Sequence, residues 1–334
     1  MAGKEFKILS IDGGGIKGLF SSTILEHLEE INKCLISDHF DMICGTSTGG
    51  LIALAASLRN PARDISEIYL QHGKVIFPHR SKLRGIWLQV AGGGKFSDAP
   101  LRKVLEKTFG ERKLRESNNI LCIPSYSVTD ARPWVFKFDH REGNLRRDNN
   151  TSYVDIALAT SAAPTYFPMA QIANYDNKQF VDGGVWANNP TMTGLIEALK
   201  CFVGEGKEYD RIKILSISSL SHTGGKRTGM KRHRGFISWQ DELFETAMTG
   251  QSFFTDYFMR TVHHISEVPV DYVRIPSAKL SSEQEKIVQL DVASNPAIDL
   301  IRGKGNDIGF EWASKREVKD FFKQQKTYTT NGKL

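Results

Sequence analysis

The stretch from residue 40 to residue 58 constrains the fold more than any other part of the chain. Residues 40–44 (FDMIC) predict a β-strand, residues 45–49 read Gly-Thr-Ser-Thr-Gly, and residues 51–58 (LIALAASL) favour a helix. A strand that turns sharply into a helix, with a serine at the turn, is the pattern of a nucleophile elbow. Gly45 and Gly49 lack Cβ atoms, so strand and helix can close around Ser47. We therefore predict Ser47 as a nucleophile at a helix N-terminus, where N–H groups and the helix dipole stabilise negative charge.

A glycine-rich loop follows the first predicted strand. Residues 6–11 (FKILSI) predict the strand, residues 12–18 read Asp-Gly-Gly-Gly-Ile-Lys-Gly, and residues 19–33 predict a helix. The spacing Gly13-x-Gly15-x-x-Gly18 matches a dinucleotide-binding fingerprint, but the acidic residue that such a site needs about 20 residues later is not well placed. We favour an anion cradle for a reaction intermediate, because consecutive glycines expose N–H groups and Lys17 adds positive charge. A plain glycine-rich turn is the remaining alternative.

An acidic residue at a strand end provides a partner for the serine. Residues 180–181 predict a short strand that leads directly to Asp182, and Gly183 and Gly184 follow. This arrangement repeats the setting of Ser47, with a side chain at a strand tip and glycines that permit close backbone approach. The alternative is an ordinary Asp-Gly-Gly turn.

Composition limits the class of protein and its partners. The chain has 334 residues, 40% of them hydrophobic and 25% charged, which is ordinary for a globular protein with a sizeable core. The net charge of +6 favours anionic surfaces such as phospholipid head groups. The four cysteines form no Cys-x-x-Cys pair, which indicates reduced thiols. No signal peptide is evident and no apolar run reaches about 18 residues, so we expect a cytoplasmic protein that meets a membrane only peripherally.

Four motifs together carry a family resemblance: residues 12–18 (DGGGIKG), 45–49 (GTSTG), 159–164 (ATSAAP) and 182–184 (DGG). In order and spacing they resemble the bacterial patatin-like phospholipases, over about residues 5–217. The resemblance implies a three-layer α/β/α fold with a central, mostly parallel sheet, and hydrolysis of lipid acyl esters without a cofactor. It also implies Ser47 as nucleophile, Asp182 as general base, and an oxyanion hole made by backbone amides. The amides belong to Gly13, Gly14 and Gly15, and the supporting residues are Lys17, Gly18, Gly45, Gly49, Gly183 and Gly184.

A serine–aspartate dyad and a triad with histidine are the two catalytic alternatives. The resemblance favours the dyad, whereas His222, just after a predicted strand at 212–217, would complete a Ser…Asp…His order. A carboxylate is a weak base for a hydroxyl, so we expect burial to raise the pKa of Asp182 or the helix dipole to lower that of Ser47. The histidines and cysteines lack metal-ligand spacing, and no nucleic-acid module is evident.

The sequence departs from the family pattern at two places. Residues 216–220 read Ser-Ile-Ser-Ser-Leu, where many members have a Leu-Gly-Thr-Gly type of turn. Position 17 is lysine where plant members usually carry arginine, so the charge is kept but bidentate geometry is lost.

The remaining segments carry no motif of their own. We expect a single domain over residues 1–334, in which residues 218–334 complete the fold with helices at 238–262, 281–290 and 295–302 and a strand at 271–275. The tail at 327–334 is expected to fray. A basic and aromatic stretch at 74–95 suits a lid or a membrane-surface patch, or else a packed insertion. The basic loop at 224–234 could meet phosphates.

The resemblance also suggests how such an enzyme is controlled. Some bacterial patatin-like phospholipases are effectors of antiphage defence that a cyclic dinucleotide switches on to degrade the inner membrane. We expect the same of this chain, because a membrane-degrading enzyme must stay inactive until it is needed, and we also expect self-association. The alternatives are a constitutive lipase or esterase, and a silent lipid- or nucleotide-binding module.

Overall fold

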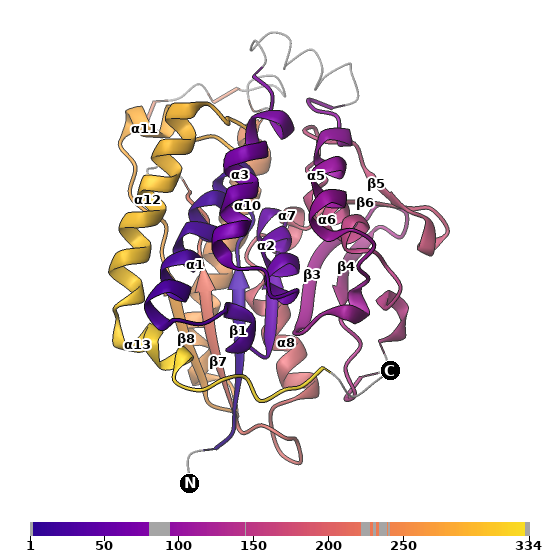
Figure 1. Cartoon of the computed structure of the whole chain (residues 1–334), viewed down its shortest axis with the longest axis vertical. Coiled ribbons are helices and arrows are strands. Elements are labelled where there is room, and N and C mark those ends of the chain that lie inside the picture. The colour runs from indigo at the N-terminus through magenta and orange to yellow at the C-terminus, as the bar shows by residue number, and fades with distance from the viewer. Residues whose placement is uncertain are drawn as a thin grey trace.

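A mixed β-sheet of eight strands runs through the centre of the molecule (Figure 1). The computed structural model describes residues 3–79, 94–143, 145–221, 228–229, 232–233, 239 and 241–330. The strands are β1 (Glu5–Ile11), β2 (Met42–Gly45), β3 (Ile120–Ser127), β4 (Arg132–Lys137), β5 (Ala170–Ile172), β6 (Lys178–Asp182), β7 (Arg211–Ile217) and β8 (Val270–Ile275). Their order is β5-β6-β3-β2-β1-β7-β8, with β4 also paired to β3.

The register of the central strands brings the glycine-rich loop and the Ser47 turn together. Strands β1, β2, β3, β7 and β8 are parallel to their neighbours in this group, and β4, β5 and β6 join antiparallel. Ile11 of β1 pairs with Gly45 of β2 and with Ile217 of β7. The glycine-rich loop, the elbow and the segment after β7 therefore leave the same edge of the sheet at the same level, where α/β proteins place their ligands.

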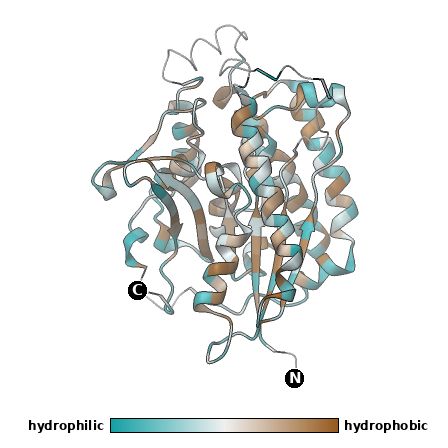
Figure 2. Cartoon of the chain, turned by 180° about the vertical axis from the view of Figure 1, so that it is seen from behind, coloured by the Kyte–Doolittle hydropathy of each residue, from teal (hydrophilic) through white to brown (hydrophobic). Residues whose placement is uncertain are grey.

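Helices cover both faces of this sheet, which confirms the predicted three-layer α/β/α fold. The helices are α1 (Gly18–Asn32), α2 (Thr48–Ser57), α3 (Ala62–Ile76), α5 (Ala99–Phe109), α6 (Tyr153–Ser161), α7 (Gly184–Ala187), α8 (Thr191–Cys201), α10 (Asp241–Thr261), α11 (Ser282–Ile287), α12 (Asn295–Ala313) and α13 (Arg316–Lys319). Seen from behind, hydrophobic stretches follow the central strands and the outer helices are mixed (Figure 2).

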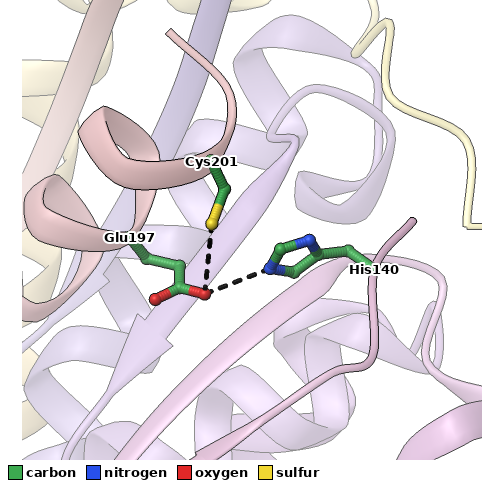
Figure 3. A group of neighbouring side chains, drawn as sticks. All are labelled: His140, Glu197 and Cys201. Atoms are coloured by element: carbon green, nitrogen blue, oxygen red, sulfur yellow. Dashed lines mark hydrogen bonds and ion pairs between the residues drawn. The ribbon is translucent and has the colours of Figure 1, made fainter. Parts of the chain in front are cut away.

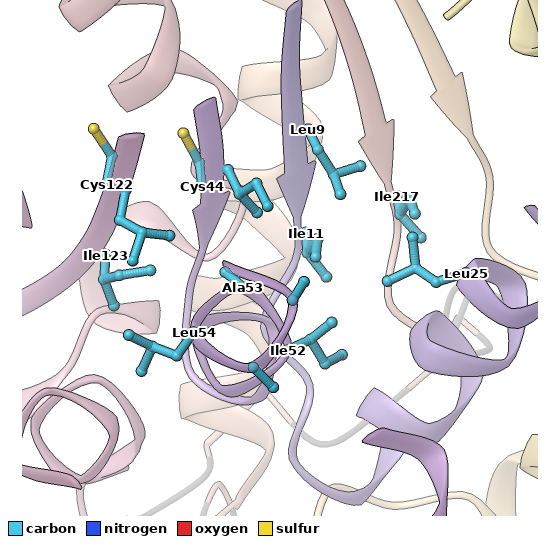
Figure 4. Packing of buried hydrophobic residues seen from close by; sticks show 14 of the residues in the cluster. Leu9, Ile11, Leu25, Cys44, Ile52, Ala53, Leu54, Cys122, Ile123 and Ile217 are labelled. Carbon is cyan, nitrogen blue, oxygen red and sulfur yellow. The ribbon is translucent and has the colours of Figure 1, made fainter. Parts of the chain in front are cut away.

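Alternation along the strands separates two apolar interfaces. Figure 4 shows Leu25 of α1 beside Ile217, and Ile52 of α2 near Ile11 of β1. On the opposite face Gly194 of α8 packs so closely that an added Cβ would lie 2.6 Å from the sulfur of Cys44. The side chains of Ile11, Leu25, Ile52 and Ile217 are all fully buried, as expected for a sheet that helices cover on both faces.

Helix α12 is longer than the predicted segment 295–302. The glycines at 303, 305 and 309 weaken helix propensity, which is why the sequence suggests an earlier end. In the structure two of them let α12 approach α1. A Cβ added at Gly305 would lie 2.8 Å from the Thr23 side chain, and a Cβ added at Gly309 would lie 2.6 Å from the His27 ring. Close packing against α1 therefore outweighs the low propensity.

The prediction that the tail frays from residue 327 is wrong for its first residues. The backbone N–H groups of Thr327 and Tyr328 donate to the buried carboxylate of Asp41 at 3.0 and 2.8 Å. The Tyr328 side chain is 2% exposed. A buried carboxylate needs donors, and these amides supply them, so the tail is held beneath the start of β2.

Some predicted features lie wholly or largely outside the described residues. These are most of the basic and aromatic stretch at 74–95, most of the basic loop at 224–234, and His222. Within the described ranges, no helix combines the length and hydrophobicity that crossing a bilayer requires.

Candidate active site

Ser47 occupies a strained backbone position between β2 and α2. Its φ and ψ are 54° and −126°, which a residue with a side chain rarely adopts. The neighbouring glycines make this turn feasible. A Cβ added at Gly45 would lie 2.1 Å from the carbonyl oxygen of Gly49, and a Cβ added at Gly49 would lie 2.3 Å from the carbonyl oxygen of Ile11. The elbow therefore requires the glycines that the sequence motif supplies, and it holds Ser47 at the N-terminus of α2.

Thr160 fixes the backbone of the elbow. Its hydroxyl accepts a hydrogen bond from the backbone N–H of Ser47 at 3.0 Å and donates to the carbonyl of Pro124 at 2.6 Å. Sequence reasoning noted the motif that contains Thr160 but assigned this residue no role, because its partners come from distant parts of the chain.

Asp182 lies at the end of β6, where its carboxylate meets the serine. It is 1% exposed, lies beside the Ser47 hydroxyl, and accepts a hydrogen bond from the backbone N–H of Gly184 at 2.7 Å. Burial raises the pKa of Asp182 to about 7, although the Ser47 hydroxyl and the Gly184 N–H act in the opposite direction. Gly183 allows the close approach of strands, since an added Cβ would lie 2.4 Å from the carbonyl oxygen of Pro124.

The glycine-rich loop after β1 offers two free amides rather than three. The N–H of Gly13 donates to the carbonyl of Asn188 at 3.0 Å, which removes it from the predicted set of oxyanion donors. For the amides of Gly14 and Gly15, the described residues provide no acceptor. Gly15 has a φ of +59°, and an added Cβ would lie 2.1 Å from the carbonyl oxygen of Leu290, so this position requires glycine.

A buried ion pair from the C-terminal third anchors the start of this loop. Arg274 of β8 donates to both carboxylate oxygens of Asp12, at 2.5 and 3.2 Å, and to the hydroxyl of Ser216 at 2.6 Å. The two charged side chains are 9% and 3% exposed. Asp12 immediately precedes the glycines, so the bidentate pair fixes their position relative to the sheet. Sequence reasoning missed Arg274 because it lies 262 residues from Asp12 and belongs to no motif.

Two cavities meet at the loop. An apolar cavity of about 50 Å³ contains Ser47 and Asp182, and its walls include Ile16, Leu51, Phe77 and Phe244. A second cavity of about 200 Å³, more polar than the first and called the polar cavity below, lies on the side of Gly13, Gly14 and Lys17, and its walls include Ser219, Glu245 and Arg274. Met248 and Leu290 line both. The predicted supporting residue Lys17 therefore faces the polar cavity, whereas Gly18 packs against the hydroxyl of Tyr69.

One group of potential metal ligands stands out among the described residues. It consists of His140, Glu197 and Cys201, and Figure 3 shows the histidine and the cysteine both directed at the Glu197 carboxylate. The Nε2 of His140 lies 3.1 Å from that carboxylate, and Lys137 forms an ion pair with its other oxygen. Burial raises the pKa of Glu197, but the hydrogen bonds from His140 and Lys137 outweigh it and lower the pKa to about 2. Because an ammonium group already neutralises Glu197, we assign these residues to a structural network.

An α/β sheet with a strained serine elbow at its carboxyl edge, and a buried acidic side chain in the same cavity as that serine, defines the architecture of a serine hydrolase. The sequence model of the family described as patatin-like phospholipase matches residues 9–195. The chain belongs to this family, which confirms the predicted class of phospholipase-type hydrolase.

Individual relatives cover most of the chain. A "cGAMP-activated phospholipase" of Pseudomonas aeruginosa (strain BWHPSA011 / Pa011) is 31% identical over 90% of this chain and 87% of its own length. A protein of the same name from Vibrio cholerae serotype O1 is 28% identical over 96% of this chain and 95% of its own length. Among solved structures, VipD from Legionella pneumophila aligns with 98% of this chain and 68% of its own, at 12% identity and a TM-score of 0.43.

Proposed function

We propose that the chain hydrolyses acyl esters of phospholipids with Ser47 and Asp182 as a dyad. The observation that carries this proposal is the strained Ser47 elbow in one cavity with the buried carboxylate of Asp182, whose pKa burial raises to about 7. A base with a pKa near the working pH can both accept and return a proton efficiently.

The chemistry follows in two halves. As Ser47 Oγ attacks the acyl carbonyl, its proton passes to Asp182, and the N–H groups of Gly14 and Gly15 stabilise the developing oxyanion. The intermediate collapses to an acyl-enzyme, and the leaving alcohol takes the proton from Asp182. Water then attacks the acyl-enzyme and gives its proton to Asp182, after which the fatty acid leaves with Ser47 reprotonated.

Activation by a cyclic dinucleotide is the second part of the proposal. Two relatives that match nearly the whole chain are named cGAMP-activated phospholipases. The apolar cavity, at about 50 Å³, is well below the roughly 300–1,000 Å³ of typical ligand sites, so an acyl chain cannot enter without a conformational change. We propose that cGAMP favours the widened state, and that the enzyme then acts at a membrane surface in antiphage defence. Action on the inner membrane and self-association remain predictions.

The test combines active-site labelling with lipid hydrolysis. Purified wild type and Ser47→Ala are incubated with phospholipid vesicles, with and without cGAMP and other cyclic dinucleotides, and fatty-acid release is measured. A fluorophosphonate probe reports in parallel whether Ser47 is reactive. We expect release only with wild type and one nucleotide, and a loss of about 10³-fold or more in Ser47→Ala.

Each alternative function has a distinct result in this experiment. Release that needs Ser47 but no nucleotide would support a constitutive lipase or esterase. Neither release nor labelling under any condition would support a silent binding module and refute the proposal.

A further inference from the structure

Among the described residues, the polar cavity beside the glycine-rich loop contains four ion pairs, of which only one is open, in that neither of its members has a closer charged partner. Arg274 and Asp12 are in bidentate contact at 2.5 and 3.2 Å. The Nε of Arg260 donates to Asp256 at 3.0 Å, and the Nε of Arg274 lies 3.9 Å from the same carboxylate group. In the fourth pair, Lys17 Nζ lies 3.8 Å from Glu245 Oε1, which is too far for a hydrogen bond. The Lys17 side chain is nevertheless only 7% exposed, so the cavity holds a buried ammonium group whose carboxylate partner stands off.

Two further buried polar atoms in this cavity lack partners among the described residues. They are the hydroxyl oxygen of Ser219 and Oδ1 of Asn188, on side chains of residues that are 6% and 5% exposed. Both lie against the glycine-rich loop. A Cβ added at Gly14 would be 1.9 Å from the Ser219 hydroxyl oxygen, and a Cβ added at Gly13 would be 2.6 Å from Asn188 Oδ1. A buried polar group without a partner costs free energy, and it is often satisfied by a ligand. Ser219 also belongs to the segment 216–220, where this sequence departs from the family pattern.

The position of the cavity relates it to the reaction. The apolar cavity holds Ser47, the polar cavity lies across the loop of Gly13 to Lys17, and Met248 and Leu290 line both. A phospholipid whose ester reaches Ser47, with its acyl chain on the apolar side, therefore directs its glycerophosphate head toward the polar cavity.

We propose that this cavity binds a phospholipid head group that carries both a phosphate and a primary ammonium group, as in phosphatidylethanolamine. The proposal rests on the phospholipase function above and assigns the head-group preference of the same site. Lys17 and the Ser219 hydroxyl bind the phosphate, and Glu245 and Asn188 Oδ1 accept hydrogen bonds from the ammonium.

Charge balance is the reason for this choice. A zwitterion replaces the single open pair with two matched pairs and leaves no buried charge alone. An anionic head such as phosphatidylglycerol pairs with Lys17 but leaves Glu245 beside a second negative charge. A choline head has no N–H donor for Glu245 or Asn188. Glu245 is therefore a specificity-determining residue.

The experiment compares head groups at constant acyl composition. Phosphatidylethanolamine, phosphatidylglycerol and phosphatidylcholine are presented one at a time in mixed micelles of the same neutral detergent, with the nucleotide that activates wild type, and kcat/KM for fatty-acid release is measured. Wild type is expected to prefer phosphatidylethanolamine by about tenfold or more. Glu245→Gln removes that preference, and Glu245→Lys inverts it in favour of phosphatidylglycerol. The control is Glu283→Gln, which removes an exposed carboxylate on α11 and leaves the wild-type ratios unchanged.

A second measurement does not depend on lipid hydrolysis. Soluble glycerophosphoethanolamine is expected to inhibit hydrolysis of a short neutral ester at lower concentration than glycerophosphoglycerol, and Glu245→Gln to abolish the difference. Equal kcat/KM for the three lipids, or ratios that Glu245 variants do not change, would overturn the inference while the hydrolase stands. Absence of any ester hydrolysis and of Ser47 labelling would instead refute the proposed function on which it rests.

Discussion

Replacing Asp182 with asparagine should change stability in a way that depends on pH. Burial raises the pKa of this carboxyl from 3.8 to about 7 in the folded chain. Between these values the folded state retains a proton that the unfolded state releases, so the free energy of unfolding of the wild type falls as the pH rises. Each pKa unit is worth about 1.4 kcal/mol, which gives a total of about 4 kcal/mol. Asp182→Asn removes this titration, so it should gain stability relative to wild type as the pH rises toward 8.

The assay is urea unfolding of both proteins at pH 5.5 and pH 8.5. About 1.5 of the shifted pKa units lie between these conditions, so the stability of Asp182→Asn minus that of wild type should increase by about 2 kcal/mol. Any constant cost of the amide cancels in this comparison. The control is Asp130→Asn, which removes a half-buried carboxylate whose pKa Lys178 lowers, and it should show no such increase over this range. A difference for Asp182→Asn that is equal at both pH values would refute the reasoning.

Three further predictions follow from the site. Because Asp182 must be ionised to act as a base, kcat/KM for a short ester should rise about tenfold from pH 6 to pH 8, as a pH–rate profile would show, and a flat profile would contradict its role. Arg274→Gln should lower kcat by about 10²-fold with KM nearly unchanged, because Arg274 holds the glycine-rich loop that we propose as the source of the oxyanion donors. The control Arg211→Gln, which removes a half-exposed ion pair with Asp271, should change neither kcat nor KM. Gly49→Ala should lower the free energy of unfolding by about 3 kcal/mol or more in urea titrations. Gly303→Ala, where nothing lies within 4 Å, should be neutral or stabilising, and equal costs would contradict the strained elbow.

Local patterns were sufficient to predict the elements that build the site. The apolar runs before the glycines correspond to β1 and β2, and the segments predicted as helices at 19–33 and 51–58 correspond to α1 and α2. Each of these depends on the residues of its own segment, through periodicity, β-branching or a glycine at a sharp turn. The same is true of the Ser47 elbow, because its geometry is dictated by the two glycines beside it.

Interactions between distant segments could not be predicted in this way. Whether a glycine amide is free depends on what lies opposite, and Asn188 takes the N–H of Gly13 although nothing near Gly13 in the sequence indicates it. Thr160 and Arg274 are similar cases, because each stabilises the site through a partner more than 100 residues away. The pKa of Asp182 could be expected to rise, but its extent depends on complete burial that only the assembled sheet produces.

The C-terminal third lines both cavities of the candidate active site and does not only form an outer layer. Helix α10 contributes Phe244 to the apolar cavity, Glu245 to the polar cavity and Met248 to both. Adjacent residues of a helix point in different directions, so a rotation or shift of α10 must alter both cavities at once. Strand β8 holds the glycine-rich loop through Arg274, and Leu290 closes around Gly15. The residues that we propose to control acyl entry, head-group binding and the oxyanion donors thus lie between residues 244 and 290, and we expect a ligand that moves α10 relative to β8 to change all three together.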